Sequence, residues 1–129
     1  MKRAWNRLLE VAGSLAVCMI GLVLIGCKTY ESHWIDADVE NQTGESIHEL
    51  EIDYPTASFG SNGLAPGAAL HYRFQIRGSG PVKVQYLFEN GRPASAQGLN
   101  LEEHQQGQLT IRLLPQGKVE FVPKLKPAA

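Results

Sequence analysis

The stretch Leu70-His71-Tyr72-Arg73-Phe74-Gln75-Ile76-Arg77 decides the fold. Apolar and polar side chains alternate through it, so one set would point into a core and the other into solvent. A period of two is typical of a half-buried β-strand. We therefore expect a strand over residues 70–77, with the aromatic rings of Tyr72 and Phe74 in the core.

The same alternation recurs on both sides of this stretch. It is clear over residues 35–41, 48–54 and 82–88, where Tyr86 and Phe88 join the expected core, and weaker near 94–101, 108–114 and 118–122. Turn-forming residues separate these runs, at Thr43-Gly44, Asn62-Gly63, Pro66-Gly67, Gly78-Ser79-Gly80, Asn90-Gly91 and Gln116-Gly117. Asn90-Gly91 is a strong hairpin signal. About seven short strands without helical periodicity after Cys27 predict an all-β, two-sheet sandwich.

Two turn motifs add a resemblance to this prediction. Asn41-Gln42-Thr43-Gly44 follows an early strand, and Leu64-Ala65-Pro66-Gly67 precedes the strand at 70–77. Over residues 34–88 the chain resembles bacterial immunoglobulin-like or fibronectin-like modules, which implies an immunoglobulin-like sandwich and no particular activity. Asn41-Gln42-Thr43 also has the form of an N-glycosylation acceptor, but we expect it to cap a turn.

The N-terminus has the layout of an export signal. Lys2, Arg3 and Arg7 precede a run from Val11 to Gly26 that has no charged residue, and this order is typical of a secretory signal, here an apolar signal helix. The run ends in Leu24-Ile25-Gly26-Cys27, which resembles the lipobox of bacterial lipoproteins. That resemblance implies cleavage before Cys27 and attachment of lipid to its sulfur. An uncleaved transmembrane helix is the alternative, although 16 uncharged residues fall short of the roughly 20 that span a bilayer; ordinary secretion is a second alternative.

These predictions divide the chain into four parts. Residues 1–26 are the expected signal peptide, 27–33 the lipidated cysteine with a short tether, 34–122 the sandwich, and 123–129 a disordered tail. Cys18 would leave with the signal peptide, so Cys27 is the one thiol of the mature chain and no intramolecular disulfide is expected. Lys28 stands where Asp would favour inner-membrane retention in enterobacterial-type lipoproteins, which implies an outer-membrane lipoprotein facing the periplasm.

The charges of the mature chain are unevenly distributed. Residues 29–72 hold eight carboxylates and no Lys or Arg, whereas residues 73–129 hold eight basic and four acidic residues. In the immunoglobulin-like arrangement the strand at 35–41 pairs with the strand at 70–77, so its acids would face His71, Arg73 and Arg77. The alternative is an acidic contact face for a basic protein partner, formed by Asp36, Asp38, Glu40, Glu49, Glu51 and Asp53.

No pattern in the sequence indicates catalysis. The histidines at 33, 48, 71 and 104 have no metal-ligand spacing, and Asp36-x-Asp38-x-Glu40 lacks the glycine and the twelfth-position acid of a calcium loop. A nucleophile elbow is also missing, and no basic stripe indicates nucleic acid. We therefore expect no enzyme, no metal and no cofactor beyond the lipid on Cys27. The expected function is a non-catalytic interaction or accessory module that contacts another envelope protein; the alternative is a small-ligand carrier.

Overall fold

The computed structural model describes residues 33–127, so the signal segment, the lipobox and Cys27 lie outside the described residues. Eight β-strands account for most of this part, and a single 3-10 turn at Pro115–Gly117 is the one departure from strands and loops within it. The strands are β1 (Ile35–Asn41), β2 (Ile47–Tyr54), β3 (Ala57–Leu64), β4 (Ala69–Phe74), β5 (Gly80–Leu87), β6 (Pro93–Leu101), β7 (Gln106–Leu113) and β8 (Val119–Lys126). Within residues 33–127 no helix has the length and apolarity needed to cross a membrane.

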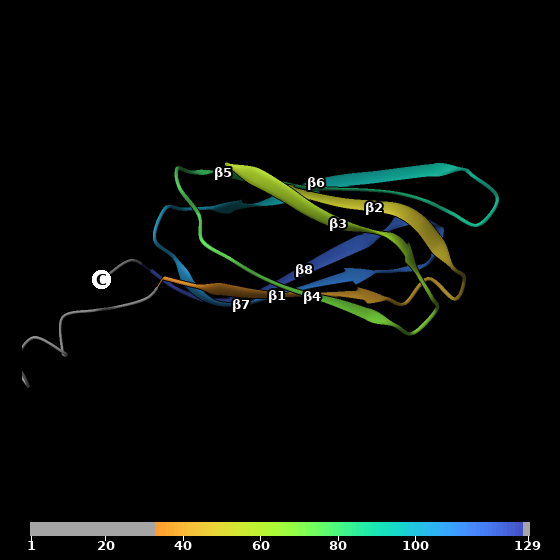
Figure 1. Cartoon of the computed structure of the whole chain (residues 1–129), viewed down its shortest axis with the longest axis horizontal. Helices are drawn as coiled ribbons and strands as arrows, with labels where there is room; N and C mark the ends of the chain where they lie inside the picture. Colours follow the sequence, from red (N-terminus) through yellow and green to blue (C-terminus); the bar gives the residue numbers. More distant parts are fainter. Residues whose placement is uncertain (1–32, 128–129) are drawn as a thin grey trace, which may run out of the picture. The chain divides into compact units, whose positions relative to one another are not determined.

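The strands form two four-stranded sheets that face each other (Figure 1). Sheet A has the order β4-β1-β7-β8 and sheet B the order β3-β2-β5-β6. Neighbouring strands are antiparallel except β1 and β7, which run parallel. The predicted all-β, two-sheet sandwich is therefore confirmed.

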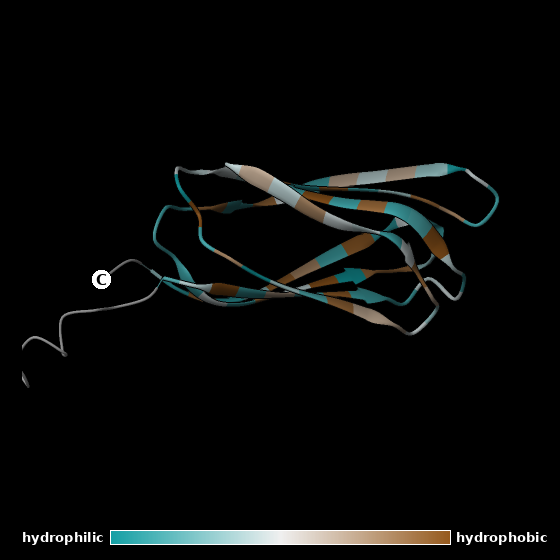
Figure 2. Ribbon diagram, in the orientation of Figure 1, coloured by the Kyte–Doolittle hydropathy of each residue, from teal (hydrophilic) through white to brown (hydrophobic). Residues whose placement is uncertain are grey.

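The core lies between the sheets and is apolar. Figure 2 shows hydrophobic residues alternating with hydrophilic ones along the strands, as the period of two requires. Both sheets contribute inward side chains such as Ile35, Val39, Ile52, Val84 and Ile111, which are all at most 1% exposed. Phe74, Tyr86 and Phe88 are buried as predicted, whereas Tyr72 is 42% exposed because β4 is an edge strand.

Asn41 is fully buried and its side chain bonds to the backbone of two turns. Its Nδ2 donates to the carbonyl oxygens of Glu45 at 2.8 Å, Leu64 at 2.9 Å and Ala65 at 3.2 Å, and its Oδ1 accepts from Thr43 N and Oγ1. The Asn41 carbonyl also accepts from Gly67 N at 2.8 Å. The two turn motifs noted in the sequence therefore bind each other, and Asn41 caps its turn as expected.

Two strand predictions were wrong. Residues 57–64 form β3, although Asn62-Gly63 was predicted as a turn; this strand has no apolar alternation because only Phe59 is buried from it. The predicted disordered tail is also wrong over residues 123–126, since β8 continues to Lys126. Pro123 lies opposite Leu109 on an edge strand, where a missing N–H donor is tolerated.

The end of β4 and the turn at Asn90-Gly91 can also be compared with the prediction. β4 ends at Phe74 rather than residue 77, which leaves Arg77 outside the sheet. The hairpin at Asn90-Gly91 is confirmed: Gly91 has a φ of 82°, and Phe88 N donates to the Arg92 carbonyl at 2.9 Å.

Candidate interaction surfaces

The acidic residues of β1 are matched by basic partners on the outer face of sheet A. Asp36 lies opposite Arg73 with a 3.5 Å contact, and Asp38 lies opposite His71 and bonds to it. The predicted cross-strand pairing is confirmed for these two acids. These side chains are solvent-exposed, so each pair contributes roughly 0.2–1 kcal/mol.

Glu40 departs from the predicted pairing. It contacts Arg112 Nε at 3.3 Å, from the neighbouring strand β7, and Arg112 also contacts Glu120 of β8 at 3.6 Å. Arg77, the predicted third partner, lies beyond the end of β4. The cause is the parallel pairing of β1 with β7, which places Glu40 opposite Arg112.

The acidic residues of β2 belong to the other sheet. Glu49, Glu51 and Asp53 lie on sheet B, so the six predicted carboxylates form two separate rows rather than one contact face. Lys83 on β5 lies opposite Asp53 in the register. Among the described residues no ion pair within 4.0 Å involves these three acids.

The carboxylates of the β2 row act on each other. The pKa of Glu51 is raised, first by a hydrogen bond with Asp53, then by repulsion from the Asp53 charge, and last by burial; the charge of Lys83 opposes these effects. Lys83 offsets this charge only in part, because the row holds the carboxylates of Glu49, Glu51 and Asp53 beside one lysine, so it keeps a net negative charge. Sheet B therefore has an acidic outer row, whereas each acid of β1 on sheet A contacts a basic residue.

A β-bulge shapes the surface beside this row. Glu49 has a φ of 49°, and the pairing with β5 shifts register between His48 and Glu51. On the other side of β2, a Cβ added to Gly60 would lie 1.9 Å from the Leu50 carbonyl oxygen, so only glycine fits there. The backbones of β2 and β3 are thus close together at Gly60, where β3 presents no side chain.

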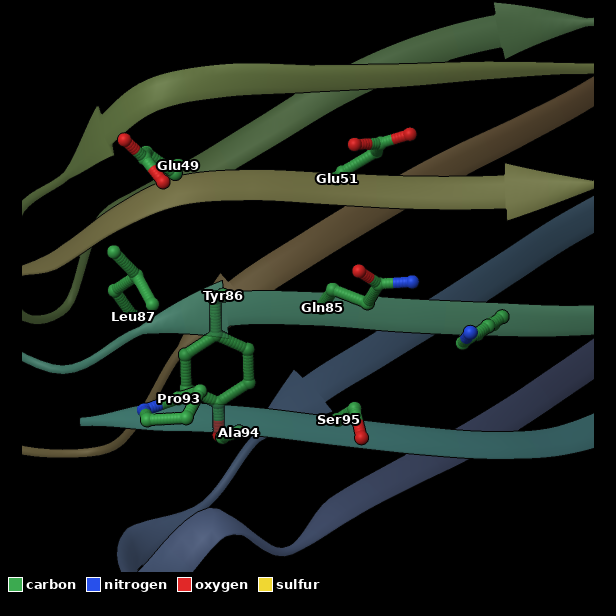
Figure 3. A pocket seen from close by; sticks show the side chains of 9 residues that line it. Glu49, Glu51, Gln85, Tyr86, Leu87, Pro93, Ala94 and Ser95 are labelled. Carbon is green, nitrogen blue, oxygen red and sulfur yellow. The ribbon is translucent and has the colours of Figure 1, made fainter. Parts of the chain in front are cut away.

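Two open hollows flank Glu49 and Glu51. One, of about 460 Å³, lies toward β5 and β6 and is lined by the two acids together with Gln85, Leu87, Pro93 and Ser95 (Figure 3). The other, of about 700 Å³, lies along β3 and is lined by Ser58, Gly60 and Asn62. The sequence did not lead us to expect that β3 lines one side of the acidic row. The signal was present, because residues 57–64 contain no charged side chain.

The described residues bring no catalytic constellation together. The rings of His33 and His104 meet edge-on with centroids 5.2 Å apart, while His71 is bonded to Asp38. Within residues 33–127 no three potential metal ligands are grouped. Tyr86 is buried with its hydroxyl unpartnered, and burial raises its pKa, with the charge of Glu45 adding to the effect.

Comparisons with known proteins bear on the fold alone. No protein-family model matches the chain, and no curated protein matches it. The chain is similar to a protein from Eubacterium rectale whose structure was solved by NMR, at 12% sequence identity and a TM-score of 0.53. The similarity covers 72% of this chain and 90% of that one.

Proposed function

We propose that this chain is an exported lipoprotein, anchored through lipid on Cys27 in the outer membrane facing the periplasm, whose sandwich is a non-catalytic interaction module. The observation that carries the proposal is Leu24-Ile25-Gly26-Cys27 at the end of an apolar run with a basic start. Two or three acyl chains hold a protein stably on a membrane, since each buried CH₂ contributes about 0.8 kcal/mol. The first strand begins at Ile35, eight residues after Cys27, so the module acts close to the lipid surface.

The sandwich is immunoglobulin-like in this proposal. The pairings β4-β1 and β2-β5-β6 correspond to the E-B and C-F-G pairings of immunoglobulin domains, with β3 beside β2 as the C′ strand is beside C. β7 takes the edge of β1 that strand A occupies in that fold. It departs from the immunoglobulin pattern by coming late in the chain and running parallel to β1.

The packing favours an interaction module over a small-ligand carrier. Seventeen apolar side chains are buried in the described part, from both sheets. The hollows around Glu49 and Glu51 are open and lie on the outer face of sheet B. A carrier needs an enclosed, largely apolar site, whereas open polar hollows beside an acidic row suit contact with a protein.

The anchor is tested by replacing each cysteine separately in cells that produce the full chain. Cys27→Ser removes the sulfur that would carry the lipid, so we expect unprocessed precursor. Cys18→Ser is the matched control, because Cys18 lies nine residues earlier in the same apolar run, and we expect it to yield mature protein in the membrane fraction. Mature, membrane-bound Cys27→Ser protein would contradict the proposal.

A further inference from the structure

The four edge strands of the sandwich are protected to very different degrees. Exposed strand edges invite pairing with another chain, and charged side chains, proline and bulges prevent it. On sheet A, β4 carries His71 and Arg73, and β8 carries Pro123 with charged residues on both sides of it. Both edges of sheet A therefore have the usual protection.

On sheet B the two edges differ from each other. β6 begins with Pro93 and is irregular at Leu99, which has a φ of 49°, while Phe121 from β8 packs where a Cβ on Gly98 would lie. β3 has no charged residue, no proline and no positive-φ residue. Among the described edges, β3 is thus the one left open for strand addition.

The outer side of β3 favours a basic occupant. Gly60 lies opposite Glu51, and Ser58 lies opposite Asp53, so small side chains separate the open edge from the acidic row. Adjacent strands are about 4.8 Å apart. A Lys or Arg on a strand added to β3 could therefore extend across Gly60, through the 700 Å³ hollow, toward the carboxylates of Glu49 and Glu51.

The inner side of the same edge favours an apolar occupant. Phe59 of β3 stacks on Tyr72 of β4, with ring centroids 4.4 Å apart and planes 15° from parallel. Phe74 and Tyr54 continue this aromatic cluster at 4.2 Å. Tyr72 remains 42% exposed at the side of the sandwich where the edge strands β3 and β4 lie. Alternate residues of a strand added to β3 would therefore cover its ring.

We propose that β3 binds an extended segment of another envelope protein by strand addition, and that this segment alternates basic with apolar side chains. The basic residues meet the row of Glu49 and Glu51, and the apolar ones cover Tyr72. Main-chain hydrogen bonds supply affinity in this mode, and the alternating side chains supply specificity. The inference rests on the proposed interaction module and names the kind of partner that it takes.

The test is site-specific photocrosslinking in cells that produce the full chain. The photoreactive residue replaces Asn62 on β3 or, as matched control, Gln97 on β6, and crosslinked peptides are sequenced. We expect a product from position 62 with a different protein, at a peptide of alternating basic and apolar residues, and little from position 97. Ser58→Lys should reduce the yield at least tenfold by guarding the edge, whereas Ser95→Lys on β6 should leave it unchanged.

The double variant Glu49→Gln, Glu51→Gln supplies a second measure that leaves the backbone of β3 untouched. We expect it to reduce the yield several-fold, because basic side chains would lose their partners. Crosslinking from position 97 alone would overturn the inference while leaving an interaction module. A product joining two copies of this chain, or a partner peptide without the alternation, would also overturn it. No product from either position would count against both the inference and the module.

Discussion

Replacing Asn41 with alanine should remove a large share of the stability of the sandwich. Asn41 is fully buried, and its side chain joins the turn after β1 to the turn before β4. Alanine would leave the carbonyls of Glu45 and Leu64 without this donor and Thr43 without its acceptor. Each hydrogen bond contributes about 1 kcal/mol net, and a buried group left unpaired costs roughly 1–3 kcal/mol, so we expect a loss of about 3–5 kcal/mol.

This loss can be measured by urea and thermal unfolding of the full chain in detergent, with circular dichroism as the readout. For a domain of this size each kcal/mol lowers Tm by about 4–8 °C, so Asn41→Ala should unfold more than about 12 °C below the wild-type protein. Gln42→Ala is the matched control, because its side chain bonds only to the exposed Glu40 carboxylate, and it should change stability by under about 0.5 kcal/mol. A loss below about 1 kcal/mol for Asn41→Ala would refute the role assigned to this residue.

Three further predictions concern single side chains. Tyr86→Phe removes a buried, unpartnered hydroxyl and should be neutral or stabilising. Because burial raises the Tyr86 pKa above 10.0, the unfolded chain loses this proton first, so wild-type stability should fall as pH rises past that value. Urea unfolding at a series of pH values would disprove this if the stability of the variant fell as steeply as that of the wild type. Asp53→Asn should lower the Glu51 pKa toward its ordinary 4.5 in carboxyl NMR titrations, with an unchanged pKa as the contrary result. Gly60→Ala should destabilise by more than about 2 kcal/mol, since its Cβ would lie 1.9 Å from a backbone oxygen; unfolding equal to wild type would contradict that close approach.

The alternation of apolar residues was sufficient to predict the class of fold. It placed β1, β2, β4 and β5 within a few residues of their observed bounds. One face is buried in β1, β2 and β5, whereas β4 buries Phe74 alone. It failed at β3, where pairing with β2 and one buried ring, Phe59, replace a buried face. Such a strand is stabilised by pairing with its neighbour, so its own sequence shows little of the alternation that predicts a strand.

The surfaces were predicted less completely than the fold. Pairing of Asp36 and Asp38 with Arg73 and His71 followed from the expected neighbours β1 and β4. The contact of Glu40 with Arg112 depends on a parallel pairing between the first strand and the seventh, which no local pattern announces. Local alternation also could not show that the acids of β1 and β2 lie on different sheets, since that depends on where the chain crosses between them.

The central claim is that processing leaves Cys27 as the first residue, with fatty chains on its sulfur. Intact-mass and peptide mass spectrometry of the chain extracted from membranes test it most directly. The expected result is an N-terminal peptide beginning at Cys27 whose mass includes a diacylglyceryl group. An unmodified Cys27, or a membrane-bound chain that still begins at Met1, would contradict the claim.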